Sequence, residues 1–250
     1  MDWIHHFYRR QDALTGCYQL PVSDSDRRRA DLVRRWVSEQ PAAVLELGCG
    51  GGQTASAIAD MGSRVVAVDL NPSAVEHARK LAAARDDNQL RIVLGDFYAL
   101  EYRREFDLVC YFDGFGIGDD ADQQRLLKLI ARWLRPGGRA LIEVYTPWYW
   151  AMVAGQEIKY GQARRRYGYD GKASRMLDTW WPDGEPGFAV TQSLRCYSPD
   201  ELRELAHGTG LALLDIEPGG AVDYARNTFQ PSVPLDETMS YLAILAATPD

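Results

Sequence analysis

Residues 44–53, VLELGCGGGQ, bring together the residue types that could do chemistry in this chain. Glu46 stands two positions before a cluster of four glycines, and the cluster begins where an apolar run ends. A glycine-rich turn lets a backbone or a ligand approach closely, and a helix that starts there offers unpaired N–H groups with partial positive charge. The pattern therefore predicts a strand, a ligand-binding loop and a helix N-terminus, in that order.

The glycine spacing fits an adenosine-bearing cofactor, and two such cofactors compete. Gly48, Gly50 and Gly52 follow the acid-x-G-x-G-x-G spacing typical of loops that bind S-adenosylmethionine. In the dinucleotide fingerprint G-x-G-x-x-G, the third glycine would fall at Gln53. The carboxylate of Glu46 would repel a pyrophosphate, whereas it can face the ammonium group of an amino-acid moiety. The loop therefore favours S-adenosylmethionine, with NAD as the alternative.

Two further acidic residues end strand-like runs and extend the expected ligand site. Asp69 follows the glycines by about 20 residues, where a carboxylate can accept hydrogen bonds from both ribose hydroxyls, although NAD enzymes share this feature. Asp96 would accept a hydrogen bond from an adenine amino group, and Phe97 beside it would cover the ring. The alternatives are that Asp69 caps the helix starting at Pro72 and that Asp96 is an ordinary turn residue.

The elements that must position these residues alternate between strands and helices. Two helices come first, at 2–14 and 25–39. Strands are expected at 43–47, 64–68, 90–94, 107–112 and 139–145, with helices between them at 53–61, 72–85 and 119–134. After residue 145, three tryptophan- and tyrosine-rich patches show no regular alternation. The pattern resumes with a strand at 189–197, a helix from 199 to about 207, and strands at 211–216 and 239–245. Parallel strands need crossover connections, so this order predicts an α/β fold.

Five motifs in sequence order carry a family resemblance: LELGCGGG, VDLNPSAVEHAR, GDFYAL, FDLVCYFDGFG and LRPGGRALIEV. With them, residues 40–145 and the closing strands resemble the class I S-adenosylmethionine-dependent methyltransferases. The resemblance implies an α/β, Rossmann-like seven-stranded sheet, mostly parallel with its last strand antiparallel. It also implies an N-terminal helical lid at 1–40 and a methyltransferase domain at 41–250, with an acceptor-cap insertion after the fifth strand at about 146–195.

The resemblance further implies S-adenosyl-L-methionine as the cofactor and S-adenosyl-L-homocysteine as the product. Glu46, Gly48 and Gly50 would surround the methionine portion, Asp69 the ribose, and Asp96 with Phe97 the adenine. Tyr18 would belong to the lid over the cofactor. The full expected set of cofactor-binding residues is Tyr18, Glu46, Gly48, Gly50, Asp69, Leu70, Asp96, Phe97 and Phe112.

The expected acceptor residues lie after the fourth and fifth strands and in the insertion. Asp113 and Tyr145 are the candidate catalytic residues, with Asp113 either a polar acceptor contact or base, or a turn residue. Flat apolar acceptors bind well against aromatic faces, and guanidinium groups pair with carboxylates. The candidate substrate-binding residues are Trp148, Trp150, Arg166 and Trp181. Core packing of the tryptophans and a solvated charged face at Arg166 are the alternatives, and no metal site is expected.

Composition narrows the class of partner. The apolar fraction of 46% is that of a folded protein, and the net charge of −7 argues against nucleic-acid binding. No run of about 18 apolar residues is present, so no membrane span is expected, and four scattered cysteines favour a cytoplasmic setting. We therefore expect methyl transfer to a small-molecule acceptor, a biosynthetic or secondary metabolite of aromatic or keto/carboxylate character. A homodimer is compatible with the sequence, which leaves the oligomeric state open. An NAD-dependent oxidoreductase and a non-catalytic S-adenosylmethionine-binding module are the alternatives.

Overall fold

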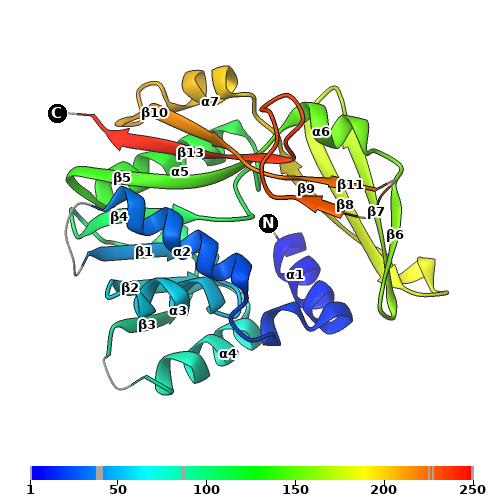
Figure 1. Cartoon of the computed structure of the whole chain (residues 1–250), viewed down its shortest axis with the longest axis horizontal. Helices are drawn as coiled ribbons and strands as arrows, with labels where there is room; N and C mark the ends of the chain where they lie inside the picture. Colours follow the sequence, from blue (N-terminus) through cyan, green and yellow to red (C-terminus); the bar gives the residue numbers. More distant parts are fainter. Residues whose placement is uncertain (1, 38–41, 86–87, 225, 227, 249–250) are drawn as a thin grey trace.

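The computed structural model describes residues 2–37, 42–85, 88–224, 226 and 228–248. Its centre is a seven-stranded sheet in the order β10-β13-β5-β4-β1-β2-β3 (Figure 1). The strands are β1 (Ala43–Leu47), β2 (Arg64–Asp69), β3 (Leu90–Leu94), β4 (Phe106–Tyr111), β5 (Leu134–Tyr145), β10 (Leu211–Pro218) and β13 (Ser240–Ala247). Strands β1 to β5 pair in parallel, and β13 runs antiparallel to both of its neighbours. The predicted fold class is confirmed, including the antiparallel last strand.

Helices cover both faces of this sheet because the central strands bury alternate residues on opposite sides. Val44 packs with Ala30 of α2 (Asp24–Trp36) and with Ile58 of α3 (Gln53–Asp60). On the other face, Leu45 belongs to the cluster of α5 (Asp120–Trp133) and α7 (Pro199–Ala206). Helix α4 (Pro72–Ala83) contacts β2 and β3. The predicted helix at 25–39 ends at Trp36 in the structure, and its residues 38 and 39 lie outside the described part.

Helix ends follow the local chemistry that the sequence suggests. The side chain of Asn71 accepts a hydrogen bond from the backbone N–H of Ser73, and Pro72 occupies the first turn of α4. Ser198 and Glu201 form a reciprocal capping box at the start of α7. These caps set where α4 leaves β2 and where α7 begins after the second sheet.

The segment after β5 is ordered as a second sheet, and the expectation that it lacks regular alternation is wrong. Helix α6 (Pro147–Met152) leads into the antiparallel strands β6 (Glu157–Tyr160), β7 (Ala163–Asp170), β8 (Arg175–Pro182) and β9 (Val190–Arg195). Met176, Asp178 and Trp180 stand at every second position of β8 and are buried on one face, together with Tyr167 of β7. Trp181 is buried on the opposite face, which hides this period in the sequence. Two short strands, β11 (Ala221–Asp223) and β12 (Thr228–Gln230), pair antiparallel in a separate two-stranded sheet.

The N-terminal helix α1 (Asp2–Thr15) lies between the two sheets (Figure 1). Phe7 is buried in a cluster with Trp180 and Val190, so α1 packs on β8 and β9. A 3-10 helix, η1 (Cys17–Gln19), then carries the chain toward α4. Residues 2–19 therefore contact both the second sheet and α4. Over the described residues, no helix is both long and apolar enough to cross a bilayer.

Candidate functional site

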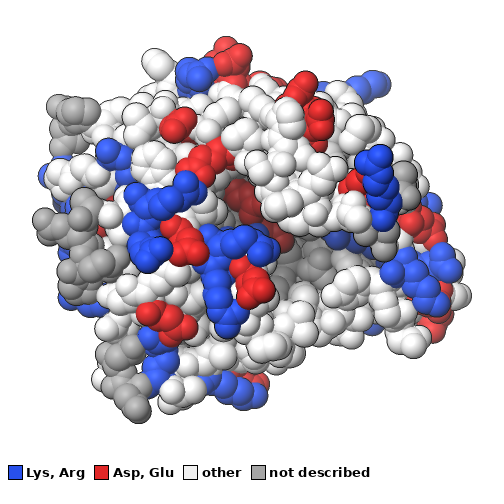
Figure 2. All heavy atoms as spheres, in the orientation of Figure 1, with Lys and Arg blue, Asp and Glu red and all other residues white. Residues whose placement is uncertain are grey.

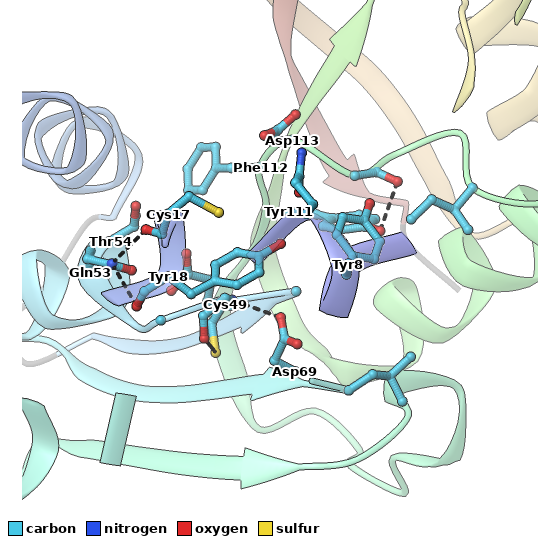
Figure 3. A pocket seen from close by; sticks show the side chains of 18 of the residues that line it. Tyr8, Cys17, Tyr18, Cys49, Gln53, Thr54, Asp69, Tyr111, Phe112 and Asp113 are labelled. Atoms are coloured by element: carbon cyan, nitrogen blue, oxygen red, sulfur yellow. Dashed lines mark hydrogen bonds between the residues drawn. The ribbon is translucent and has the colours of Figure 1, made fainter. Parts of the chain in front are cut away.

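A cavity of about 680 Å³ lies where α1 and η1 meet the carboxyl ends of the central strands and the inner face of the second sheet. Its size is in the range of cofactor and small-molecule sites. Figure 2 shows this face hollowed near its middle, with acidic atoms in the depth of the hollow. Figure 3 shows side chains of α1, η1, the glycine loop and the end of β4 converging on it. All nine expected cofactor-binding residues, and both Asp113 and Tyr145, line this one cavity.

The glycine loop links β1 to α3, as its sequence predicts. Gly48, Gly50 and Gly52 all have positive φ, at 61°, 53° and 79°, a region in which side-chain-bearing residues are strained. A Cβ on Gly52 would stand 2.6 Å from the Cβ of Ala78, and one on Gly50 would stand 2.9 Å from the ring of Tyr18. Because Gly52 and Gly50 have no side chains, α4 and η1 can pack closely against the loop, which also lines the cavity.

Glu46 is the penultimate residue of β1, and its side chain is almost fully buried at the cavity wall. Its Oε2 atom has no hydrogen-bond partner in the described part of the chain. Burial raises the pKa of Glu46 to about 8, against the opposing charge of Arg29. A buried, unpartnered carboxyl group that faces a cavity is suited to a ligand's cation.

Asp69 ends β2 and is held by two backbone amides. Its Oδ2 accepts a hydrogen bond from Gly50 N–H at 2.8 Å, and its Oδ1 accepts one from Asn71 N–H at 2.7 Å. Burial raises the pKa of Asp69, while these amides act to lower it. The cap of α4 belongs to Asn71, so the alternative that Asp69 caps that helix is wrong.

Asp96 and Phe97 follow β3 at the start of the 3-10 helix η2 (Phe97–Ala99). The carboxylate of Asp96 accepts a hydrogen bond from Tyr98 N–H at 2.8 Å and remains exposed. The ring of Phe97 packs on Tyr98 and Tyr111, with centroids 4.9 and 5.6 Å away. Asp96 therefore has the geometry of a turn residue and also lines the cavity.

The sequence reasoning missed Gln53, which ties η1 to the glycine loop. Its Nε2 donates to the carbonyl oxygens of Tyr18 at 3.2 Å and Leu20 at 2.9 Å. In Figure 3 the ring of Tyr18 crosses the middle of the site, and hydrogen bonds run from Gln53 to the backbone. The sequence marked Gln53 only as the residue that replaces the third glycine of a dinucleotide-binding loop, and this did not indicate its contacts with η1.

Asp113 and Tyr145 come together across the ends of β4 and β5. The Tyr145 hydroxyl donates a short hydrogen bond to Oδ1 of Asp113. Asp113 has a φ of 56°, and its side chain is accessible from the cavity. Burial among surrounding walls raises its pKa, and nearby Glu143 adds to this, while the Tyr145 hydrogen bond, Arg29 and Arg165 oppose it.

Arg29 of α2 is a second residue that the sequence reasoning missed. Its guanidinium lies 3.0 Å from the Glu143 carboxylate and 5.1 Å from the ring centre of Phe112. Burial acts to lower the pKa of Arg29, but the charge of Glu143 raises it overall. Nothing in its spacing distinguishes Arg29 from the other arginines of α2, because its partner is 114 residues away.

The second sheet supplies different residues from those expected. Arg165, Met176, Asp178 and Gln192 point into the cavity from β7, β8 and β9. The Arg165 guanidinium binds the buried Asp178 carboxylate at 2.7 and 2.8 Å and stacks between the rings of Tyr167 and Trp180. Gln192 Nε2 donates to the Tyr8 hydroxyl at 2.7 Å and so joins β9 to α1.

The four residues expected to bind the acceptor lie outside this wall. Arg166 and Trp181 are on the opposite face of the second sheet, since adjacent strand residues point to opposite sides, and Arg166 is exposed. Trp148 and Trp150 belong to the cluster around α6, where Trp150 N–H donates to the Met239 carbonyl and its ring packs on Tyr145. For Trp150 this matches the alternative of core packing. No group of three or more metal-ligating side chains occurs among the described residues.

Comparison with known proteins relates the central sheet to methyltransferases. The protein-family model described as a methyltransferase domain matches residues 44–138. The cypemycin N-terminal methyltransferase of a Streptomyces species is 36% identical over 118 residues, covering 45% of this chain and 47% of that protein. The chain thus spans about half the length of this relative.

Two longer likenesses extend beyond the matched domain. A probable S-adenosylmethionine-dependent methyltransferase of Mycolicibacterium smegmatis is 28% identical over 217 residues, or 84% of this chain and 74% of that protein. The solved structure of the CcbJ methyltransferase from Streptomyces caelestis has a TM-score of 0.71 at 22% identity, covering 92% of this chain and 91% of that chain. At 22% identity, the likeness to the CcbJ structure shows a shared fold only.

Proposed function

Because residues 44–138 match a methyltransferase domain and the chain resembles the class I S-adenosylmethionine-dependent methyltransferases, we propose that it transfers the methyl group of S-adenosylmethionine to a small molecule bound in the same cavity. One observation carries the proposal. The glycine loop with Glu46 and the Asp113–Tyr145 pair open on a single space of about 680 Å³. A cofactor and a small acceptor can therefore lie side by side in it, as in-line displacement requires.

The cofactor half of the site is proposed from residues at the ends of β1, β2 and β3. The unpartnered carboxyl group of Glu46 fits the ammonium of the methionine portion. Asp69, fixed by two amides, is positioned to accept ribose hydroxyls, and Asp96 with Phe97 to meet the adenine. When bound, S-adenosylmethionine supplies a carbon already activated by its positive sulfur.

The chain's own part in the reaction is alignment and exclusion of water. Helix α1 and η1 close one side of the cavity, held by the Gln192–Tyr8 and Gln53–Tyr18 hydrogen bonds. The second sheet closes the other side with the Arg165–Asp178 ion pair. These contacts hold the walls together around the cavity and so would exclude water from the reacting groups.

The acceptor's chemical character is part of the proposal. Rings of Tyr8, Tyr18, Phe112 and Tyr145 line the cavity and support the expectation of an aromatic acceptor. A carboxylate-bearing acceptor is less well supported, because Arg165 is already bound bidentately by Asp178. One relative is named for methylation at an N-terminus, which adds support for a nitrogen acceptor.

Calorimetry and label transfer test the proposal against its alternatives. We expect S-adenosylhomocysteine and S-adenosylmethionine to bind, and NAD not to bind. Incubation with S-adenosylmethionine labelled in its methyl group, together with a metabolite extract, is expected to yield labelled small molecules. Binding of NAD alone would support an oxidoreductase, and cofactor binding without any label transfer would support a non-catalytic module. Either result would overturn the proposal.

A further inference from the structure

We propose that the acceptor is an amine, held as a cation against the Asp113 carboxylate, and that Asp113 removes the proton that blocks the nitrogen lone pair. This inference rests on the proposed function and names the chemistry of its second substrate. Its starting point is the charge balance at the acceptor end of the cavity.

Each arginine near Asp113 already has an acidic partner of its own. Arg29 is paired with Glu143 at 3.0 Å, and Arg165 is paired with Asp178 at 2.7 Å. Asp113 forms no ion pair within the described ranges, and its one hydrogen bond comes from the neutral Tyr145 hydroxyl. The acceptor end therefore carries one carboxylate more than its cations balance, and a ligand cation would restore neutrality.

The cavity thus holds two carboxyl groups without a cationic partner, one at each end. Glu46, at the glycine loop, is proposed to face the ammonium of the cofactor. Asp113, beyond the end of β4, is left for the acceptor. A carboxylate or phosphate acceptor would meet repulsion from Asp113, whereas a protonated amine would gain a charge-assisted hydrogen bond.

The backbone holds Asp113 in a defined place. Its φ of 56° lies in the left-handed region, which aspartate and asparagine tolerate better than most residues. The Tyr111 hydroxyl donates to the Gly114 carbonyl at 2.9 Å and closes the loop around it. The Tyr145 hydroxyl binds Oδ1, so Oδ2 is the oxygen available to the amine.

The reaction balances with the residues present. The protonated amine gives one proton to the Asp113 carboxylate, which frees the nitrogen lone pair. That pair forms the new N–C bond to the methyl carbon while the S–C bond of S-adenosylmethionine breaks, and the electrons of the broken bond remain on sulfur. The product leaves as a methylated ammonium ion, and Asp113 returns its proton to solvent. Burial raises the pKa of Asp113, which brings its proton affinity closer to that of an amine.

The titratable groups that interact electrostatically with Asp113 come from several elements. They are Tyr8 of α1, Cys17 and Tyr18 of η1, Arg29 of α2, Tyr111 of β4, Glu143 and Tyr145 of β5, and Arg165 of β7. Of these, Tyr145 forms the direct hydrogen bond, which lowers the pKa of Asp113. Tyr145 is therefore a positioning residue in this proposal.

The test uses three probes that share one ring and differ in the head group: benzylamine, benzyl alcohol and benzoate. Their binding to the full chain loaded with S-adenosylhomocysteine is measured by calorimetry. We expect benzylamine to bind most tightly. In Asp113→Asn its affinity should fall about ten- to a hundredfold, the range for a lost charge-assisted hydrogen bond, with benzyl alcohol nearly unaffected. Asparagine tolerates the positive φ, so the loop should keep its shape.

Two controls separate the possible failures. Asp200→Asn removes an acidic charge from an exposed site at the start of α7 and should leave all three affinities unchanged. Benzylamine binding should weaken at low pH, where Asp113 becomes protonated. In Tyr145→Phe this weakening should begin at a higher pH, because the variant lacks a hydrogen bond that lowers the pKa of Asp113. If S-adenosylhomocysteine binds but benzoate is preferred, or benzylamine fails to bind, or Asp113→Asn leaves benzylamine unaffected, this inference is overturned and the proposed function stands. If S-adenosylhomocysteine does not bind, the proposed function itself fails.

Discussion

The two walls of the cavity place their polar side chains in different ways. On the central sheet, Glu46, Asp69 and Asp113 stand at or just beyond the carboxyl ends of parallel strands. On the second sheet, Arg165 and Asp178 stand within antiparallel strands, where every second residue faces the cavity. The first placement follows from strand order, and the second follows from strand register.

The walls also differ in how their charges are satisfied. Glu46 and Asp113 form no ion pair in the part of the chain that the structure describes, whereas Arg165 and Asp178 neutralise each other. The central sheet thus offers charge to ligands, and the second sheet offers a rigid surface that is already neutral. We infer that changes in the two walls should have separable effects, and the variants below test that separation.

The largest effect is expected from Gly52→Ala, at the base of the glycine loop. The new Cβ would stand 2.6 Å from the Cβ of Ala78, at a φ of 79°. We expect urea denaturation to show a loss of about 3 kcal/mol in the free energy of unfolding, of which about 1 to 2 comes from the φ angle and the rest from overpacking.

Gly161→Ala is the matched control for Gly52→Ala. Gly161 also has a positive φ, 58°, but nothing lies within 4 Å of its added Cβ. Gly161→Ala should lower the free energy of unfolding only by the contribution of the φ angle, about 1 to 2 kcal/mol. Equal losses in the two variants would show that the close contact between the loop and α4 contributes nothing.

Asp69→Ala tests the cofactor wall. Removing the carboxylate should weaken binding of S-adenosylmethionine by roughly 1.5 to 3 kcal/mol, or about ten- to a hundredfold, through loss of charge-assisted hydrogen bonds to the ribose. Calorimetry measures this, with the exposed Glu76→Ala on α4 as the comparison. Unchanged affinity would mean that the ribose does not lie at the end of β2.

Asp178→Asn tests the second wall. The variant leaves Arg165 without a carboxylate, and we expect the free energy of unfolding to fall by about 1 to 2 kcal/mol, less than for a fully buried pair because the Arg165 side chain is 27% exposed. Affinity for S-adenosylmethionine should stay within about twofold of the original. A tenfold loss there would show that the two walls are not separable.

The smallest expected effect is the release of a proton from Glu46 when the cofactor binds. Burial raises the pKa of Glu46 to about 8, so the carboxyl group holds a proton at pH 6.5 in the ligand-free chain. Pairing with the cofactor's ammonium lowers that pKa, so binding should release up to about one proton. Calorimetry in two buffers of different ionisation enthalpy measures the release, and Glu46→Gln should abolish it. Proton uptake, or the same release in Glu46→Gln, would contradict the placement of the ammonium.

Much of the cofactor wall could be predicted because its signals are local. The strands 43–47 and 90–94 match β1 and β3 residue for residue, and the caps at Asn71 and Ser198 are where the sequence puts them. In a parallel α/β sheet the loop after each strand opens on the same edge. Glu46, Asp69 and Asp96 therefore had to meet near one cavity once the strands were placed.

The acceptor wall could not be predicted in the same way. Arg166 was chosen and Arg165 is the residue that faces the cavity, a difference of one position that reverses the side of the strand. Trp180 and Trp181 are buried on opposite faces, so hydrophobicity alone did not reveal the register. The aromatic residues chosen at Trp148 and Trp150 pack around α6.

The sequence by itself determined the methyltransferase resemblance, the parallel sheet with its antiparallel last strand, and the acidic residues at the strand ends, because glycine spacing, strand alternation and helix caps act over a few residues. Only the tertiary structure decided which charges remain unpaired. Arg29 pairs with Glu143 across 114 positions of the chain, Gln53 binds the Tyr18 carbonyl in η1 across 35, and Gln192 reaches Tyr8 across 184. Such partners are chosen by packing in three dimensions, and no local pattern records them.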